Sequence, residues 1–178
     1  MRPEVTSKAR SLSISQSSPL SRRHLLTLAG AGIAGLALTP AFAQEMPTEK
    51  ISATDAHEKA LAGEIILVDI RRPDEWAETG VGIGAIALDM RTDSFVPTLI
   101  ALRQANPDTP IAMICRTGNR SQFVVSALSG QGFPGLVDVT EGMAGGRNGT
   151  GWLPTGLPVY AGTPENVAAK LTEAMPTE

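Results

Sequence analysis

The chain has 178 residues, enough for one domain of common size plus an additional segment. Its formal net charge of −3 is unevenly distributed: residues 1–43 contain five Lys or Arg and one acid, whereas the remainder contains ten basic and seventeen acidic residues. Because residues 44–178 carry this excess of acids, they lack the basic surface that nucleic-acid binding requires. The single cysteine excludes an internal disulfide. Because Cys115 and His57 are the only Cys and His residues after residue 43, a zinc site built from Cys and His is excluded as well.

The first 43 residues are predicted to be a cleavable export signal. Residues 25–38 form an uncharged apolar run that is too short for a membrane-spanning helix and typical of a signal peptide. The alternative is a buried N-terminal helix. Ala41-Phe42-Ala43 supplies small residues at the positions that a signal peptidase recognises, which places the cleavage before Gln44.

A pair of arginines stands directly before the apolar run. The stretch Ser21-Arg22-Arg23-His24-Leu25-Leu26 resembles the twin-arginine export signal, although Leu25 replaces the usual Phe and the trailing Lys is missing. This resemblance implies a periplasmic protein that meets the export machinery and signal peptidase and has no stable membrane insertion after cleavage. The mature chain is expected to comprise a domain over residues 44–162 and a C-terminal helix and tail over 163–178.

Beyond residue 44, short apolar strands alternate with helices. The strands are indicated by apolar runs rich in β-branched residues, typical of strands buried on both faces. They are predicted at residues 65–70, 85–88, 111–114 and 136–139. Because strands and helices alternate, the sequence predicts an α/β fold with a central, mostly parallel sheet that is flanked by helices on both faces.

The helices are indicated by capping residues and by apolar residues at helical spacing. They are predicted at residues 54–62 with Thr54-Asp55 as the cap, 73–78, 94–106, 121–128 with Ser121 as the cap, and from Thr163-Pro164 onward. The stretch from residue 142 to 156 is Gly-rich and predicted to be irregular. It contains Trp152, which is interpreted as a core residue, with a flap over a pocket as the alternative.

Two of the predicted strands end in residues whose side chains can take part in binding or catalysis. Asp69 and Arg71 end one strand and Cys115 ends another, and ligands of parallel sheets bind at this edge. A single cysteine is more commonly a small buried hydrophobe than a nucleophile. Here, however, the thiol lies between a strand and a helix, where backbone N–H groups, Arg116 and Arg120 favour a thiolate and an anionic substrate.

The segment Cys115-Arg116-Thr117-Gly118-Asn119-Arg120-Ser121 resembles the active-site loop of single-domain rhodaneses, which are sulfurtransferases. Residues 68–76 resemble the first signature of the family, and residues 141–145 with 156–159 resemble its closing signature. In place of the usual Gly-His-Ile-Pro-Gly-Ala stretch, residues 80–85 read Gly-Val-Gly-Ile-Gly-Ala, so a histidine at the edge of the site is absent. The resemblance covers about residues 50–162.

This resemblance implies a rhodanese-like domain that works through a persulfide on Cys115, without a metal or cofactor. The expected donor is thiosulfate or a similar small anion, and the acceptor is cyanide or a thiol. The backbone N–H groups of residues 116–121 would hold the persulfide, and Arg120 would bind the sulfonate of the donor with support from Arg116. Asp69 and Arg71 are expected to brace the loop.

Other functions remain open on the sequence alone. A periplasmic persulfide carrier would need the same Cys115, and only its lack of turnover would distinguish it. A dual-specificity phosphatase or arsenate reductase would have Cys-x5-Arg, whereas Cys115 and Arg120 are spaced as Cys-x4-Arg. A Ser-His-Asp triad would have to use His57, which lies in a polar stretch. Nucleotide binding is disfavoured because the chain contains no Gly-Lys-Ser/Thr.

Overall fold

The structure is a computed structural model, which describes residues 48–175. The predicted export signal and the cleavage before Gln44 therefore lie outside the described residues. Within residues 48–175, no helix has the length and hydropathy that crossing a bilayer would require.

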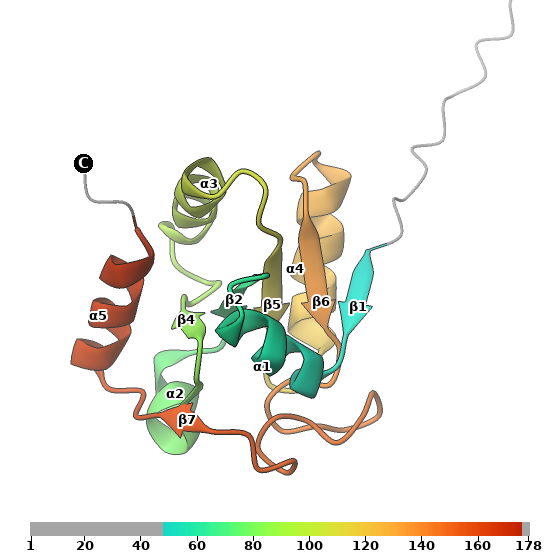
Figure 1. The fold of residues 1–178 in the computed structure, drawn as a ribbon, viewed down its shortest axis with the longest axis vertical. Helices are drawn as coiled ribbons and strands as arrows, with labels where there is room; N and C mark the ends of the chain where they lie inside the picture. The colour runs from blue at the N-terminus through green and yellow to red at the C-terminus, as the bar shows by residue number, and fades with distance from the viewer. Residues whose placement is uncertain (1–47, 176–178) are drawn as a thin grey trace, which may run out of the picture. The chain divides into compact units, whose positions relative to one another are not determined.

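Five parallel strands form the central sheet, in the order β1-β6-β5-β2-β4 (Figure 1). The strands are β1 (Glu49–Ile51), β2 (Ile66–Asp69), β4 (Ala85–Ala87), β5 (Ile111–Ile114) and β6 (Leu136–Val139). The α/β prediction and all four predicted strands are confirmed. Three strands were missed: β1, and the antiparallel pair β3 (Val81–Gly82) and β7 (Val159–Tyr160). Each has only two or three residues, too few to produce a recognisable apolar run or an alternation of apolar and polar residues.

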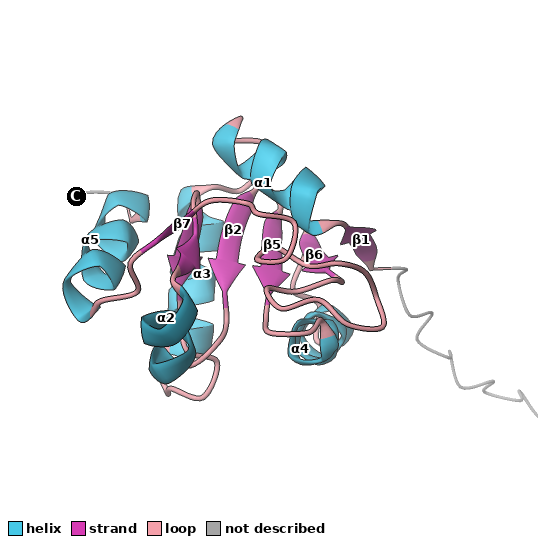
Figure 2. Ribbon diagram, turned by 90° about the horizontal axis from the view of Figure 1, so that it is seen from below, coloured by secondary structure: helices cyan, strands magenta, loops and turns pink. Residues whose placement is uncertain are grey.

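Helices cover both faces of this sheet, as predicted (Figure 2). One face packs against α1 and the irregular segment after β6, and the other packs against α3 and α4. The short α2 follows β2, and α5 packs beside the edge strand β4. The helices are α1 (Ala53–Leu61), α2 (Pro73–Thr79), α3 (Phe95–Ala105), α4 (Asn119–Gly130) and α5 (Pro164–Ala174).

Successive residues of each inner strand contribute to opposite layers of the core. In β5, Ala112 and Ile114 belong to the layer under α1, whereas Ile111 and Met113 belong to the layer under α3 and α4. Cys115 continues this alternation into the second layer. Complete burial of an Ile or Met side chain contributes about 1.5–3 kcal/mol, so the strand that delivers Cys115 is among the most firmly held parts of the fold.

The predicted cap of α1 is wrong. Ser52, not Thr54-Asp55, precedes the helix: its hydroxyl accepts a hydrogen bond from the Asp55 N–H, and the Asp55 carboxylate accepts from the Ser52 N–H in return. This reciprocal pair satisfies two N–H groups that the first helical turn leaves free. The helix ends close to the predicted residue, before Gly63 with φ of 72°.

The predicted cap of α4 is wrong as well. Gly118 occupies the cap position with φ of 84°, and Ser121 lies within the first turn, where its hydroxyl donates to the Gly118 carbonyl oxygen at 3.0 Å. Any side chain at residue 118 would collide with the Thr140 carbonyl oxygen. Close approach of two backbones, rather than a polar capping side chain, therefore decides where α4 begins.

Trp152 is a core residue, as interpreted from the sequence. Its side chain is completely buried in the layer under α1, and its indole N–H donates to the Pro158 carbonyl oxygen at 3.1 Å. The His57 ring of α1 packs edge-on against it, with ring centroids 5.1 Å apart. The Gly-rich segment is thereby fixed to the body of the domain by one large aromatic side chain.

Candidate active site

The ends of β2 and β5 lie side by side, as the sequence predicted. The two strands are parallel neighbours in which Asp69 lies opposite Ile114. Arg71 and Cys115 therefore follow their strands at the same edge of the sheet. This edge is where parallel sheets bind ligands.

The carbonyl groups of the cysteine loop are held by the segment that follows β6. The Met143 N–H donates to the Cys115 carbonyl oxygen and the Ala144 N–H donates to that of Arg116, both at 2.8 Å. Gly142, with φ of 69°, lies against the backbone of Arg116, where an added Cβ would be 2.7 Å from the carbonyl carbon. The closing-signature residues thus fix the direction of the peptide groups in the loop.

The N–H groups of the same loop remain free. Among the described residues, none accepts a hydrogen bond from the backbone N–H of residues 116–121, six positions in succession. The last three of these positions form the first turn of α4, whose N–H groups point out of the helix and carry its positive partial charge. Unpaired N–H groups that are shielded from water are costly, so this arrangement is suited to an anion.

Cys115 precedes these groups and is completely buried. The residues that follow it differ in exposure: Arg116 and Asn119 are exposed, Thr117 is half-buried, and Gly118 and Ser121 are buried. The sulfur is therefore closed to solvent in this structure, whereas part of the loop that follows it is open. Within residues 48–175, no group of three His, Cys, Asp or Glu side chains is placed to hold a metal ion.

Arg120 is engaged by a carboxylate that sequence reasoning missed. Its two terminal nitrogens donate to the two oxygens of Glu75, at distances of 2.8 and 2.7 Å. Glu75 lies in α2, 45 positions earlier in the chain, and the sequence analysis included it only within the predicted helix of residues 73–78. No local pattern relates two residues so far apart; only their shared sheet edge could have suggested the pair.

Glu75 is held rigidly for this role. Its side chain is 7% exposed, and its Oε2 atom also accepts from the Arg72 backbone N–H at 3.1 Å and from Arg72 Nε at 3.3 Å. The hydrogen bond from Arg120 lowers the pKa of Glu75 to about 2, with a smaller contribution from Arg72, although burial opposes the shift. The same pairing raises the pKa of Arg120, and the nearby charges of Cys115 and Asp69 add to the effect. Both partners are therefore ionised at neutral pH.

Asp69 and Arg71 form a second, fully buried ion pair. The Asp69 carboxylate accepts from Arg71 through the backbone N–H, Nε and NH2, at 2.7–3.0 Å. Burial raises the pKa of Asp69, and the hydrogen bonds and charge of Arg71 counter that shift. Arg71 further donates to the carbonyl oxygens of Glu75 and Gly80 and to the Thr79 hydroxyl. The pair thus holds α2 directly and reaches the cysteine loop only through Glu75.

The contribution of the Glu75–Arg120 pair to stability is expected to disappear in acid. A lowered folded-state pKa means that the contribution is complete above the unfolded-state value near 4.5 and is lost as the pH falls through about 2. Urea unfolding should therefore show wild type more stable than Glu75→Gln by on the order of 2 kcal/mol at pH 7, with the difference vanishing near pH 2. Glu78→Gln, on an exposed position of the same helix, is the control and should leave the curve unchanged. A difference that persists at pH 2 would contradict this interpretation.

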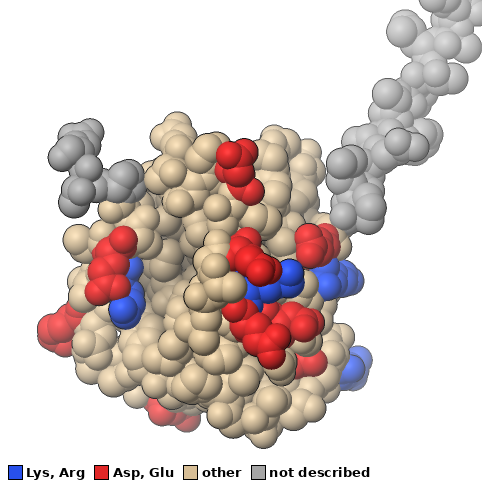
Figure 3. Space-filling model, in the orientation of Figure 1, with Lys and Arg blue, Asp and Glu red and all other residues tan. Residues whose placement is uncertain are grey.

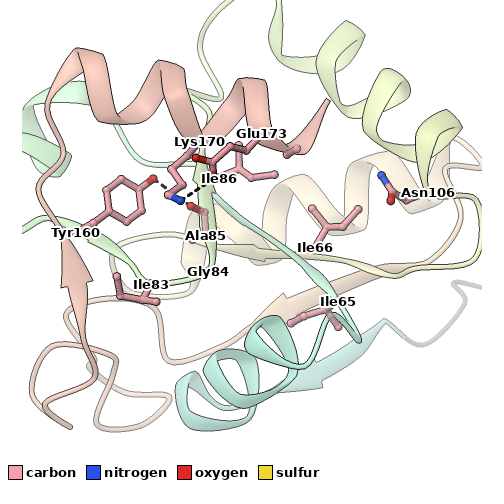
Figure 4. A pocket seen from close by; sticks show the side chains of 11 residues that line it. Ile65, Ile66, Ile83, Gly84, Ala85, Ile86, Asn106, Tyr160, Lys170 and Glu173 are labelled. Carbon is pink, nitrogen blue, oxygen red and sulfur yellow. Dashed lines mark hydrogen bonds and ion pairs between the residues drawn. The ribbon is translucent and has the colours of Figure 1, made fainter. Parts of the chain in front are cut away.

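A cavity lies away from this edge. It has a volume of about 450 Å³ and lies between β4 and α5, where Tyr160 donates to the Ala85 carbonyl oxygen and Lys170 pairs with Glu173 (Figure 4). None of its lining residues belongs to the loop of residues 115–121. Acidic side chains gather elsewhere, over α1, on the face seen in Figure 3.

Comparison with known proteins agrees with this geometry. The model of the rhodanese-like domain matches residues 52–148, more than half of the chain. This protein belongs to the family of rhodanese-like domains. It is 25% identical over 120 residues to the uncharacterized protein RP600 of Rickettsia prowazekii, with 64% of this chain and 98% of the relative covered.

Two solved structures illustrate the similarity. Rv0390 from M. tuberculosis is 24% identical, with a TM-score of 0.50 over 64% of this chain and 98% of the other. The polysulfide-sulfur transferase homodimer from Wolinella succinogenes is 25% identical, with a TM-score of 0.49 over 64% of this chain and 78% of the other. The first of these likenesses concerns the fold alone.

Proposed function

We propose that this protein is a sulfurtransferase that moves sulfane sulfur from thiosulfate, or a similar small anionic donor, through a persulfide on Cys115 to cyanide or a thiol. Membership of the rhodanese-like family supports this proposal. The observation that carries it is the set of six successive backbone N–H groups, from residues 116–121, that have no acceptor among the described residues and directly follow the only cysteine of the chain. Such a set of donors stabilises negative charge on sulfur before and after transfer.

The proposed reaction has two balanced steps. The Cys115 thiolate attacks the outer sulfur of thiosulfate; a new S–S bond forms, the S–S bond of the donor breaks, and sulfite leaves with the electron pair. The terminal sulfur of the persulfide now carries the negative charge and accepts hydrogen bonds from the loop N–H groups. Cyanide then attacks that sulfur and leaves as thiocyanate, which regenerates the thiolate. This is nucleophilic covalent catalysis.

Direct detection of the intermediate tests the proposal. The protein beginning at Gln44 is incubated with thiosulfate, desalted and measured by intact-mass and peptide mass spectrometry. A gain of one sulfur atom on the Cys115 peptide, lost again on addition of cyanide with release of thiocyanate, is the expected result. Faster hydrolysis of an aryl phosphate than transfer of sulfur would overturn it.

The complete burial of Cys115 favours one second candidate, a persulfide carrier that passes its sulfur to a particular partner. A shielded persulfide exchanges slowly with small molecules in solution. Rapid turnover of thiosulfate and cyanide would establish the enzyme. A persulfide that forms once and then survives an excess of cyanide would establish the carrier.

We further propose that the protein acts in the periplasm after twin-arginine export. The support is the sequence of residues 1–43 alone, in which Arg22-Arg23 precedes an apolar run and Ala41-Phe42-Ala43. Mass analysis of the exported form should give an N-terminus at Gln44. Replacement of both Arg22 and Arg23 by Lys should leave the uncleaved precursor in the cytoplasm, whereas Arg10→Lys, outside the motif, should not. An intact N-terminus on a cytoplasmic wild-type protein would contradict the proposal.

A further inference from the structure

We infer that Glu75 determines donor specificity: its carboxylate offsets the charge of Arg120 and so lowers the preference of the site for dianionic over monoanionic sulfur donors. This inference rests on the proposed function, because it concerns which donor that reaction accepts. It assigns a role to a residue of α2 that neither the loop sequence nor the Cys-x4-Arg spacing indicates.

The first observation is the geometry of the pair. Glu75 meets both terminal nitrogens of Arg120, the end-on arrangement that a sulfonate would itself use. Two of the five N–H groups of Arg120 are thereby occupied by a carboxylate of the protein. An anionic donor that approaches Arg120 either displaces Glu75 or binds beside its negative charge.

The second observation is that Glu75 cannot easily withdraw. It is 7% exposed and is also bound by the backbone and side chain of Arg72. Arg71 fixes the same helix through the Glu75 carbonyl oxygen and the Thr79 hydroxyl. The Arg120 side chain, in contrast, is 32% exposed and has no hydrogen-bond acceptor other than Glu75 among the described residues. The negative charge is therefore the stationary partner, and it stays in place whichever donor enters.

The third observation is the charge balance around the sulfur. Asp69 neutralises Arg71, and Glu75 neutralises Arg120. Within residues 48–175, no carboxylate forms an ion pair with Arg116, which is exposed. The loop contains two arginines, but only this solvated one contributes an uncompensated charge. A second negative charge on the donor therefore adds less binding free energy than it would if both loop arginines were uncompensated.

A pair of donors that differ by one charge tests this directly. Thiosulfate is a dianion, whereas methanethiosulfonate, in which a methyl group replaces one oxygen, is a monoanion with the same transferable sulfur. The measured quantity is the ratio of kcat/KM for thiosulfate to kcat/KM for methanethiosulfonate. Glu75→Gln removes the charge and keeps the shape, so the ratio should rise about five- to tenfold, the effect of one charge across several ångströms of partly solvated protein.

Three further variants separate charge from position. Glu75→Asp keeps the charge and shortens the side chain, so its ratio should stay within about twofold of wild type, and so should that of Glu78→Gln on the same helix. Arg120→Ala should lower kcat/KM for thiosulfate by roughly 10- to 150-fold and should lower the ratio. Combining Arg120→Ala with Glu75→Gln removes both charges and should return the ratio towards wild type.

Several results would overturn the inference. If Glu75→Gln and Glu75→Asp reduced both donors equally, Glu75 would only position Arg120. If Glu75→Gln raised alkylation of Cys115 by the neutral reagent iodoacetamide as much as it raised reaction with thiosulfate, the pair would act as a steric cover over the thiol.

A binding measurement keeps the test independent of turnover. In the Cys115→Ser protein, calorimetry with thiosulfate and methanethiosulfonate should show the same five- to tenfold change in relative affinity when Glu75 becomes Gln. If wild type forms no persulfide with any donor, the proposed function fails, while this affinity ratio still decides the role of Glu75. An unchanged affinity ratio alongside normal turnover would refute only the specificity inference.

Discussion

Cys115→Ser is expected to abolish sulfur transfer while the fold persists. The chain contains no other thiol, so no second residue can carry the persulfide. Serine is nearly isosteric with cysteine, and the neighbouring N–H groups of residues 116–121, free in the described structure, offer its hydroxyl oxygen partners. Thiocyanate formation from thiosulfate and cyanide should fall to the uncatalysed rate, and the melting temperature should change by only a few degrees.

The opposite result would support a packing role for this residue. Cys115 belongs to the buried layer under α3 and α4, which is where a structural cysteine would also lie. Transfer that continues in Cys115→Ser, together with a large fall in melting temperature, would assign the residue to the core. Cys115→Ala is the matched variant, because it tests the loss of the thiol without introducing a hydroxyl.

Arg71→Met is expected to destabilise the fold strongly. Removal of the guanidinium leaves the Asp69 carboxylate completely buried without its partner and also cuts the hydrogen bonds that hold α2. Breaking a buried ion pair from one side costs about 3–5 kcal/mol. Denaturant unfolding should show a loss of this size.

The chain supplies its own control in Asp89 and Arg91, which follow the neighbouring strand β4. This second Asp-x-Arg pair has nearly the same hydrogen bonds, with a terminal nitrogen 2.7 Å from the carboxylate in each case. Arg91, however, is 58% exposed, whereas Arg71 is 2% exposed. Arg91→Met should therefore change the free energy of unfolding little, because solvent screens an ion pair with an exposed arginine. Equal losses in the two variants would show that burial is not what makes the first pair important.

The predictable parts of the fold are the strands and helices that are determined by residues close together in the chain. The apolar run of β5 is buried on both faces, and Pro73 and Thr163-Pro164 begin helices because proline fits the first turn. The position of Cys115 beside Arg71 followed from the parallel arrangement of their strands.

The parts that were missed depend on contacts between distant segments. Nothing near Ser121 reveals that Gly118 must face the Thr140 carbonyl oxygen, although this contact decides where α4 begins. Strand β1 exists because it pairs with β6, almost ninety positions later, and two of its own three residues are charged. The pairing of Glu75 with Arg120 is of the same kind. Sequence patterns indicated Cys115 as the proposed nucleophile, but not the carboxylate that pairs with Arg120.

The anchoring of the cysteine loop has a consequence for biosynthesis. The Cys115 carbonyl is held by Met143, whose own carbonyl accepts from Leu153, while Gly142 accepts from Trp152, and the Trp152 indole reaches Pro158. Each of these contacts lies later in the chain than the thiol itself. The loop after Cys115 can therefore acquire these hydrogen bonds only after residues 142–158 have been synthesised and have left the ribosome. A product that ends before residue 142 would contain the thiol without the segment that fixes its loop.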